Sequence, residues 1–311
     1  MCAAPASVVV LPVHVSPLHL ESAELEAKAQ ELLAKVQKEG SFSELEWYYS
    51  DGAVLRRFLT ARNGDVAKAQ VLLSKALAWR LQRKPYRIDY TEIEMESRTG
   101  KLRVSPTLDK WGRPVVIFDN TCENTTDAQA QLRCLAFVLE HALRRVQGTD
   151  VSKYVIFMHL GCFSLANNAS WAVTKETMSM LMNCFAECCG HIVLHDAPWI
   201  FNSAYRAVKQ FIDPNTATKI VFVKDDVASE ALMLDVLGAN WRQITGAGAD
   251  RQNPESSPGY RHEKDWAEVL QNDLAWRQKT QNAGPLSHVA LNCALPGDEF
   301  ATPKWAETGV R

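Results

Sequence analysis

Between residues 115 and 237 the sequence alternates short apolar runs with longer amphipathic segments, and this alternation restricts the possible folds more than any other feature. Runs that are apolar on both faces are typical of strands buried in a parallel sheet. The intervening segments carry apolar residues at helical spacing, so each is expected to cover the sheet. The pattern therefore predicts an α/β unit with a mostly parallel sheet. Its expected strands are 102–104, 115–118, 154–158, 192–194 and 220–223, and its expected helices are 127–147, 170–187, 201–212 and 227–237.

The residues on either side of this unit follow other patterns. Upstream, apolar residues recur at helical spacing in Ser22–Lys38, which Gly40 ends, and Asp65 is a suitable cap for a helix over 66–83. Downstream, the composition of GAGADRQNPESSPG indicates a linker, and one more amphipathic helix is expected over 263–279. We therefore expect four regions: a disordered leader (1–20), a helical unit (21–90), the α/β lobe (91–245), and a linker, one helix and a tail (246–311).

The charge and cysteine content exclude several classes of protein. Lys and Arg number 34 against 36 Asp and Glu, and no basic run stands out, so nucleic acid is not an expected partner. The eight cysteines include no CxxC pair and are expected to be reduced thiols of a cytoplasmic protein. The apolar amino-terminal run lacks a basic start and is broken by Pro5, Pro12 and Pro17, so no secretory signal is expected.

The sequence lacks the motifs of the common α/β enzymes. It contains no GxGxxG, GxxxxGK[ST] or GxSxG, and no serine has an identifiable base partner. His191 and His195 would lie about 13 Å apart along one strand, too far to share a metal ion. A lone strand-end histidine such as His159 is more often part of a structural hydrogen-bond network than a ligand. We therefore expect neither an enzyme nor a metal site.

The stretch from Glu187 to Lys219 contains the most distinctive helix of the chain. Glu187 precedes this helix and Lys219 follows it, and its apolar residues form a single stripe. Such a stripe suits a lid over an apolar cavity, and it equally suits a helix that packs on a core. Periodicity alone does not separate the two interpretations. The stripe consists of Phe201, Ala204, Tyr205, Val208, Phe211 and Ile212.

Three segments resemble the CRAL-TRIO family of lipid-binding proteins. LRRFLTARNGDVAKAQVLLSKALAWR is similar to the helical entry of that family, and DKWGRPVVIFD is similar to its strand entry. HIVLHDAPWIFNSAYRAVKQFIDPNTATKI resembles its signature, and the likeness runs from about residue 20 to 245, nearest to the phosphatidylinositol/phosphatidylcholine transfer proteins. The resemblance implies a CRAL-TRIO fold, in which a helical unit precedes a sheet that floors a lipid cavity. It also implies that the 201–212 helix is a gate over this cavity.

The resemblance further implies a site for the phosphatidylinositol headgroup at Arg62, Glu187, Thr216 and Lys219. The chemistry is suitable, because a phosphodiester binds cations and hydroxyl groups, while inositol hydroxyls need an acceptor such as a carboxylate. A Glu–Lys pair also keeps the empty site free of an uncompensated charge. Each residue taken alone has a structural explanation as well, namely a surface charge for Arg62, a salt bridge for Glu187 and Lys219, and a helix cap for Thr216.

This sequence has different residues at the positions where family members bind phosphatidylcholine. The corresponding positions are Ser105, Val116 and Tyr154, so phosphatidylcholine is not the expected second ligand. The resemblance implies a monomeric, non-enzymatic cytoplasmic protein that associates transiently with membranes. It would transfer phosphatidylinositol, or present it to lipid-modifying enzymes in phosphoinositide signalling, with no cofactor besides the bound phospholipid. The alternative is a carrier or sensor of a sterol-like lipid or of haem, for which His159 and Tyr154 are the candidate ligands.

Overall fold

The computed structural model describes residues 22–120, 125–149, 151–161, 163–164, 170–209, 212, 214–224, 227–246 and 262–282. Within them, five strands form one sheet in the order of the sequence. The first strand is antiparallel to the second, and the other neighbours are parallel. The mostly parallel sheet expected from the sequence is therefore confirmed. The strands are β1 (Leu102–Val104), β2 (Val115–Asp119), β3 (Tyr154–His159), β4 (Cys189–His195) and β5 (Ile220–Val223).

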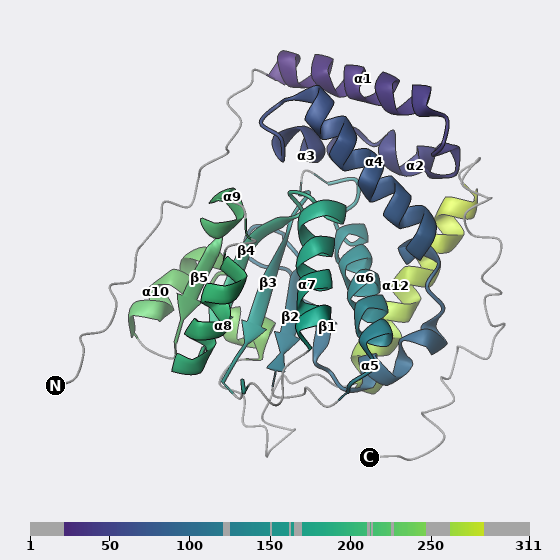
Figure 1. The fold of residues 1–311 in the computed structure, drawn as a ribbon. Helices are drawn as coiled ribbons and strands as arrows, with labels where there is room; N and C mark the ends of the chain where they lie inside the picture. The colour runs from purple at the N-terminus through teal and green to yellow at the C-terminus, as the bar shows by residue number, and fades with distance from the viewer. Residues whose placement is uncertain are drawn as a thin grey trace.

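The sequential strand order decides which helices cover which face of the sheet. Parallel strands joined by right-handed crossovers in one direction place all their connecting helices on the same face. These helices are α6 (Ala128–Arg144), α7 (Trp171–Ser179) and α8 (Trp199–Lys209), and Figure 1 shows them in front of the sheet. The opposite face packs against α10 (Val227–Val236) and α11 (Trp241–Thr245). Ile156 faces the first layer and Phe157 the second, as strand alternation requires.

The helical unit lies at the amino-terminal ends of the parallel strands (Figure 1). Asp51 and Asp65 cap its helices α3 and α4 by accepting bonds from backbone amides at 2.8 and 3.0 Å. The unit has its own apolar core, which Ala186 from the α7–β4 connection joins. The segment that contains Glu187 is therefore attached to this unit. Its helices are α1 (Ser22–Glu39), α2 (Glu46–Tyr49), α3 (Gly52–Thr60) and α4 (Val66–Arg83), and the short helices α5 (Glu94–Arg98) and α9 (Pro214–Ala217) belong to the lobe.

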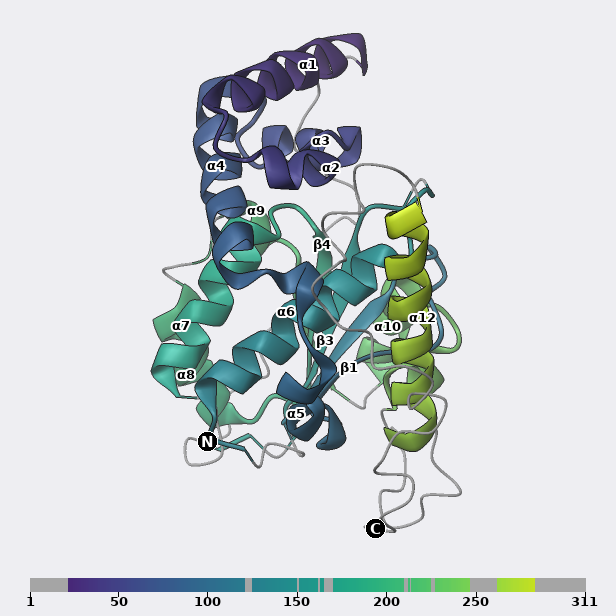
Figure 2. The same cartoon turned by 90° about the vertical axis from the view of Figure 1, so that its right-hand side faces the viewer.

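The last described helix, α12 (His262–Asn282), packs along the lobe beside α5 and α6 (Figure 2). Its Trp266 and Leu270 join the core between α6 and the sheet, and its Asp273 is fully buried. Asp273 accepts a hydrogen bond from Tyr90 and forms salt bridges with Arg144 and Arg277. Burial raises the pKa of Asp273, but these two arginines more than offset it and hold the pKa below its ordinary value. The helix expected over 263–279 is thus part of the lobe's packing.

Local details differ from the sequence expectation in two places. The helix expected over 170–187 ends as an α-helix at Ser179, and one π turn, Met180–Cys184, follows it. The third expected strand is longer than 192–194, because pairing with β3 begins at Cys189. Cys134, Cys184, Cys188 and Cys189 are free thiols, as expected for those positions. Among the helices of the described residues, none is both long and apolar enough to cross a membrane.

His141 in α6 is expected to make the protein less stable in mild acid. Its side chain is buried, and burial lowers the pKa of His141 from 6.5 to about 4. Between those values the unfolded chain binds a proton that the folded chain does not. The free energy of unfolding should therefore fall by about 3 kcal/mol as the pH drops from about 6.5 to about 4. Urea denaturation across this range measures the slope; His141→Gln should flatten it, and an equally steep slope in that variant would contradict the prediction.

Candidate functional site

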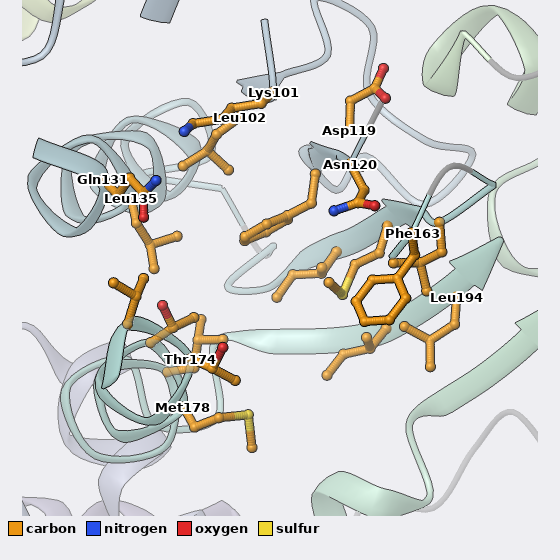
Figure 3. A pocket seen from close by; sticks show the side chains of 18 of the residues that line it. Lys101, Leu102, Asp119, Asn120, Gln131, Leu135, Phe163, Thr174, Met178 and Leu194 are labelled. Atoms are coloured by element: carbon orange, nitrogen blue, oxygen red, sulfur yellow. The ribbon is translucent and has the colours of Figure 1, made fainter. Parts of the chain in front are cut away.

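An apolar cavity of about 280 Å³ lies between the sheet and the helices α6, α7 and α8 (Figure 3). It forms because side chains of alternate strand residues point to this face, while α7 and α8 leave a gap above them. Most of its lining is hydrocarbon, so water bound there would lose hydrogen bonds and an apolar ligand would gain from burial. Its floor consists of Phe118, Ile156, Met158, Ile192, Leu194 and Ile220, and the wall formed by α7 and the following π turn consists of Val173, Thr174, Thr177, Met178 and Leu181.

Helix α8 closes one side of this cavity. Phe201, Tyr205 and Ile212, three of the proposed gate residues, line it. Phe201 packs edge-on against Phe163 at a centroid distance of 5.2 Å, and Tyr205 packs likewise against Phe222 at 5.3 Å. Ile200 and Phe201 also pack against the small core of Leu160, Phe163 and Leu194, so the described side chains that attach this helix to the lobe are apolar. The side chains of Ala204 and Val208 and the whole of Phe211 lie outside the described residues.

The end of the cavity near the carboxyl terminus of β2 is polar, which the sequence did not indicate. Lys101 and Glu96 form a salt bridge at 2.8 Å, with 9% and 2% of their side-chain surfaces exposed. Gln131 and Asn120 lie at the same end (Figure 3). The Oδ1 atom of Asn120 is buried and has no hydrogen-bond partner within the described structure. A polar atom of a ligand reaching this end would find an ion pair and an amide group.

Glu187 and Lys219, two of the four headgroup candidates, are brought together by the fold. Lys219 Nζ lies 2.8 Å from Glu187 Oε2, at the amino-terminal ends of β4 and β5. Glu187 has a positive φ of 56°, a conformation that costs a non-glycine residue about 1 kcal/mol or more. The turn from Phe185 to Cys188 thus holds this carboxylate toward the lysine. A strained conformation at a charged residue is typical of a functional position.

Arg62 and Thr216 belong to elements at the same end of the sheet as this pair. Thr216 lies in α9, and its carbonyl accepts a bond from the backbone N–H of Lys219 at 3.0 Å. Arg62 follows α3 in the helical unit at the same end of the sheet, is half-buried, and donates to the Ala61 carbonyl at 2.7 Å. The described lining of the apolar cavity includes none of the four candidates. If these residues bind a lipid, they would contact its polar headgroup and not its acyl chains.

Two basic residues that the sequence analysis missed belong to the same neighbourhood. Lys153 precedes β3, and its Nζ lies 3.7 Å from Glu187 Oε2. Burial lowers the pKa of Lys153, and the nearby charge of Lys219 lowers it further. Burial raises the pKa of Cys188, and the positive charge of Arg57 in α3 lowers it. Arg57 therefore lies close to the turn that contains Glu187 and Cys188. Its buried Nε has no hydrogen-bond acceptor among the described residues.

The positions considered for phosphatidylcholine and haem do not reach the cavity. Ser105, Val116 and Tyr154 are all buried and are not among its described lining residues, although Val116 and Tyr154 belong to the apolar core on the same face of the sheet. His159 pairs in register with His195 at the end of β4, and its imidazole lies beside Phe157 on the opposite face of the sheet. The imidazole of His159 is therefore directed away from this cavity. The sequence could not show this, because the face of a strand depends on its register.

Residues 98–235 match the family described as the CRAL/TRIO domain. The chain contains a CRAL/TRIO domain. The matched range includes all five strands and the helices around the cavity, so the resemblance inferred from the motifs is confirmed. The crystal structure of Sfh5 shares the fold, with a TM-score of 0.56 at 14% identity over 83% of this chain and 100% of that chain.

Curated relatives of this chain include a phosphatidylinositol transfer protein and a SEC14 cytosolic factor. The phosphatidylinositol transfer protein CSR1 of Eremothecium gossypii is 30% identical over 206 residues, which cover 61% of this chain and 46% of that protein. The SEC14 cytosolic factor of Kluyveromyces lactis is 25% identical over 237 residues, covering 70% and 76%. A CRAL-TRIO domain-containing protein of Schizosaccharomyces pombe, C23B6.04c, is 26% identical and is covered over 23% of its length. The chain thus spans less than half of the first and last of these relatives.

Proposed function

We propose that the protein binds phosphatidylinositol, with its acyl chains in the apolar cavity and its headgroup at Glu187, Thr216 and Lys219. The observation that carries this proposal is the partly buried charge cluster of Glu187, Lys153 and Lys219 at one end of the sheet that floors the cavity. The protein would carry the lipid between membranes or present it to lipid-modifying enzymes, without catalysing a reaction itself. It would do so in the cytoplasm, with transient membrane contact.

The charge balance of the cluster favours an anionic ligand. One carboxylate faces two ammonium groups, and the Arg57 guanidinium lies close by. A phosphodiester would compensate this excess positive charge and accept the bond that Arg57 Nε lacks within the described structure. Arg62 could approach the same group from the end of α3. The Glu187 carboxylate would remain to accept bonds from inositol hydroxyls.

The cavity would hold the acyl chains, but it gives little specificity. Each buried methylene is worth about 0.8 kcal/mol, and a similar amount is lost when the chains leave a bilayer. Selection among lipids must therefore come from polar contacts. A second apolar ligand, other than phosphatidylcholine, could use the polar cavity end at Lys101 and Asn120 instead of the cluster at Glu187.

Two exposed tryptophans support contact with a membrane. Trp171 and Trp199 begin α7 and α8, and 54% and 80% of their surfaces are exposed. Both follow the carboxyl ends of neighbouring parallel strands, so they lie at the same edge of the lobe. Tryptophan favours the interface between water and hydrocarbon. Docking by this edge would bring the start of α8 to the bilayer, where the helix could move to admit lipid.

Lys219→Ala is expected to reduce the transfer of phosphatidylinositol between vesicles by roughly ten- to hundredfold. A hydrogen bond to a charged group contributes about 1.5–3 kcal/mol, and the variant removes that contact with the phosphate. Transfer of labelled phosphatidylinositol from donor to acceptor vesicles measures the effect. Lipid extracted from the purified variant should contain less phosphatidylinositol, while other bound lipids are retained.

The matched control is Lys175→Ala, which removes an exposed lysine of α7 away from the cluster. It should transfer phosphatidylinositol like the wild type. Urea denaturation of both variants separates loss of binding from loss of folding. Wild-type transfer rates in a folded Lys219→Ala protein would show that Lys219 and Glu187 form only a structural ion pair.

A further inference from the structure

Three metal-ligating side chains converge at the carboxyl ends of β3 and β4, on the face of the sheet away from the cavity. His159 and His195 are register partners on adjacent parallel strands, so their imidazoles project side by side. Asp196 follows His195, the last residue of β4, directly. The sequence analysis considered histidines along one strand and therefore missed a pair across two strands.

The ligand atoms of this cluster have the spacing of a metal site. His195 Nδ1 lies 3.2 Å from His159 Nδ1 and 3.3 Å from Asp196 Oδ2, and all three atoms fall within 4.8 Å of one another. Zinc bonds to nitrogen and oxygen are about 2.0–2.2 Å long, so the ligand atoms of a tetrahedral site lie roughly 3.3–3.5 Å apart. Two of the observed distances are close to this range, and small movements of side chains would complete it.

The backbone directs the third ligand to this point. Strand alternation would send the side chain of Asp196 to the cavity face, opposite to that of His195. Asp196 instead has a positive φ of 52°, which ends the alternation and brings its carboxylate to the histidines. A bond from the Asp196 N–H to the Val223 carbonyl at 3.0 Å fixes this turn.

We propose that His159, His195 and Asp196 bind a divalent first-row transition metal ion such as Zn²⁺. The Nδ1 atom of His195 faces both another nitrogen and a carboxylate oxygen, and a single proton on it can be donated to only one of them. A cation between the three groups accepts a lone pair from each. His195 is fully buried, whereas 33% of the Asp196 side chain is exposed, which leaves an entry path and a position for water.

The location gives such an ion a structural consequence. Asp196 lies three residues before Trp199, the first residue of α8, and His159 ends the strand before α7. The ion would therefore join the two strand ends from which the chain enters the helices beside the cavity.

Titration of the full-length, metal-free protein with ZnCl₂ in a calorimeter tests the proposal. His159→Ala and Asp196→Asn should each weaken zinc binding by roughly tenfold or more. Asparagine tolerates the left-handed backbone at position 196, so that variant changes the ligand without disturbing the turn. His191→Gln, on the same strand but outside the cluster, should bind zinc like the wild type.

Substitution by Co²⁺ identifies the ligands. We expect visible absorption bands of a tetrahedral nitrogen and oxygen site, which His159→Ala should lose. Equal zinc affinity in the wild type and both cluster variants would overturn the proposal. A near-ultraviolet thiolate-to-cobalt band would do the same, since it would assign the metal to cysteines, and so would an absence of zinc binding at micromolar concentration.

Discussion

Asp273→Asn is expected to lower the free energy of unfolding by about 3–5 kcal/mol, the cost of removing one partner from a buried ion pair. Asparagine has nearly the same shape, but it removes the carboxylate that the buried guanidinium groups of Arg144 and Arg277 share. It also replaces the charged acceptor of the Tyr90 hydroxyl. Urea denaturation followed by circular dichroism gives the change directly.

Asp235→Asn is the matched control for this prediction. Asp235 pairs with Lys110 at 3.4 Å, and the two side chains are 46% and 35% exposed. Surface pairs of this kind contribute about 0–1 kcal/mol, so the control should remain near the wild type. Similar small losses in both variants would mean that α12 is not held to the lobe by the Asp273 cluster.

Thr177→Phe is expected to reduce lipid transfer by roughly fiftyfold without unfolding the protein. Thr177 lies on α7 and lines the cavity, so a phenyl ring there would occupy space that acyl chains need. If the ring displaces about three methylenes at about 0.8 kcal/mol each, the loss is about 2.4 kcal/mol, or roughly fiftyfold. The assay is vesicle-to-vesicle transfer, together with mass spectrometry of the lipid that copurifies.

Thr177→Val provides the control, because it removes the hydroxyl without filling the cavity. It should transfer lipid almost as well as the wild type. Undiminished transfer by Thr177→Phe would place the acyl chains elsewhere and contradict the proposed function. Reduced transfer by both variants would instead indicate that the Thr177 hydroxyl contacts the ligand.

Much of the fold follows from local patterns in the sequence. The two-sided apolar runs at 154–158 and 220–223 could be stable only inside a sheet, and the helical stripes between them could cover only its faces. Asp51 and Asp65 cap helices in the structure, as expected for Asp65 from its place before an apolar stripe. The motifs from DKWGRPVVIFD onward indicated the CRAL/TRIO domain, because they combine a strand, a turn and an amphipathic helix in one order.

The sequence by itself thus determined the element types, their order and the family, since these depend on residues that are neighbours along the chain. The tertiary structure decided which side chains meet. Lys153 approaches Glu187, and His159 approaches His195, because strand register brings together residues more than thirty positions apart. Register also placed His159 on the face away from the cavity, and Asp273 is buried because α12 returns to α5 and α6. Such contacts depend on how the elements pack, and periodicity within one element carries no information about the partner that another element supplies.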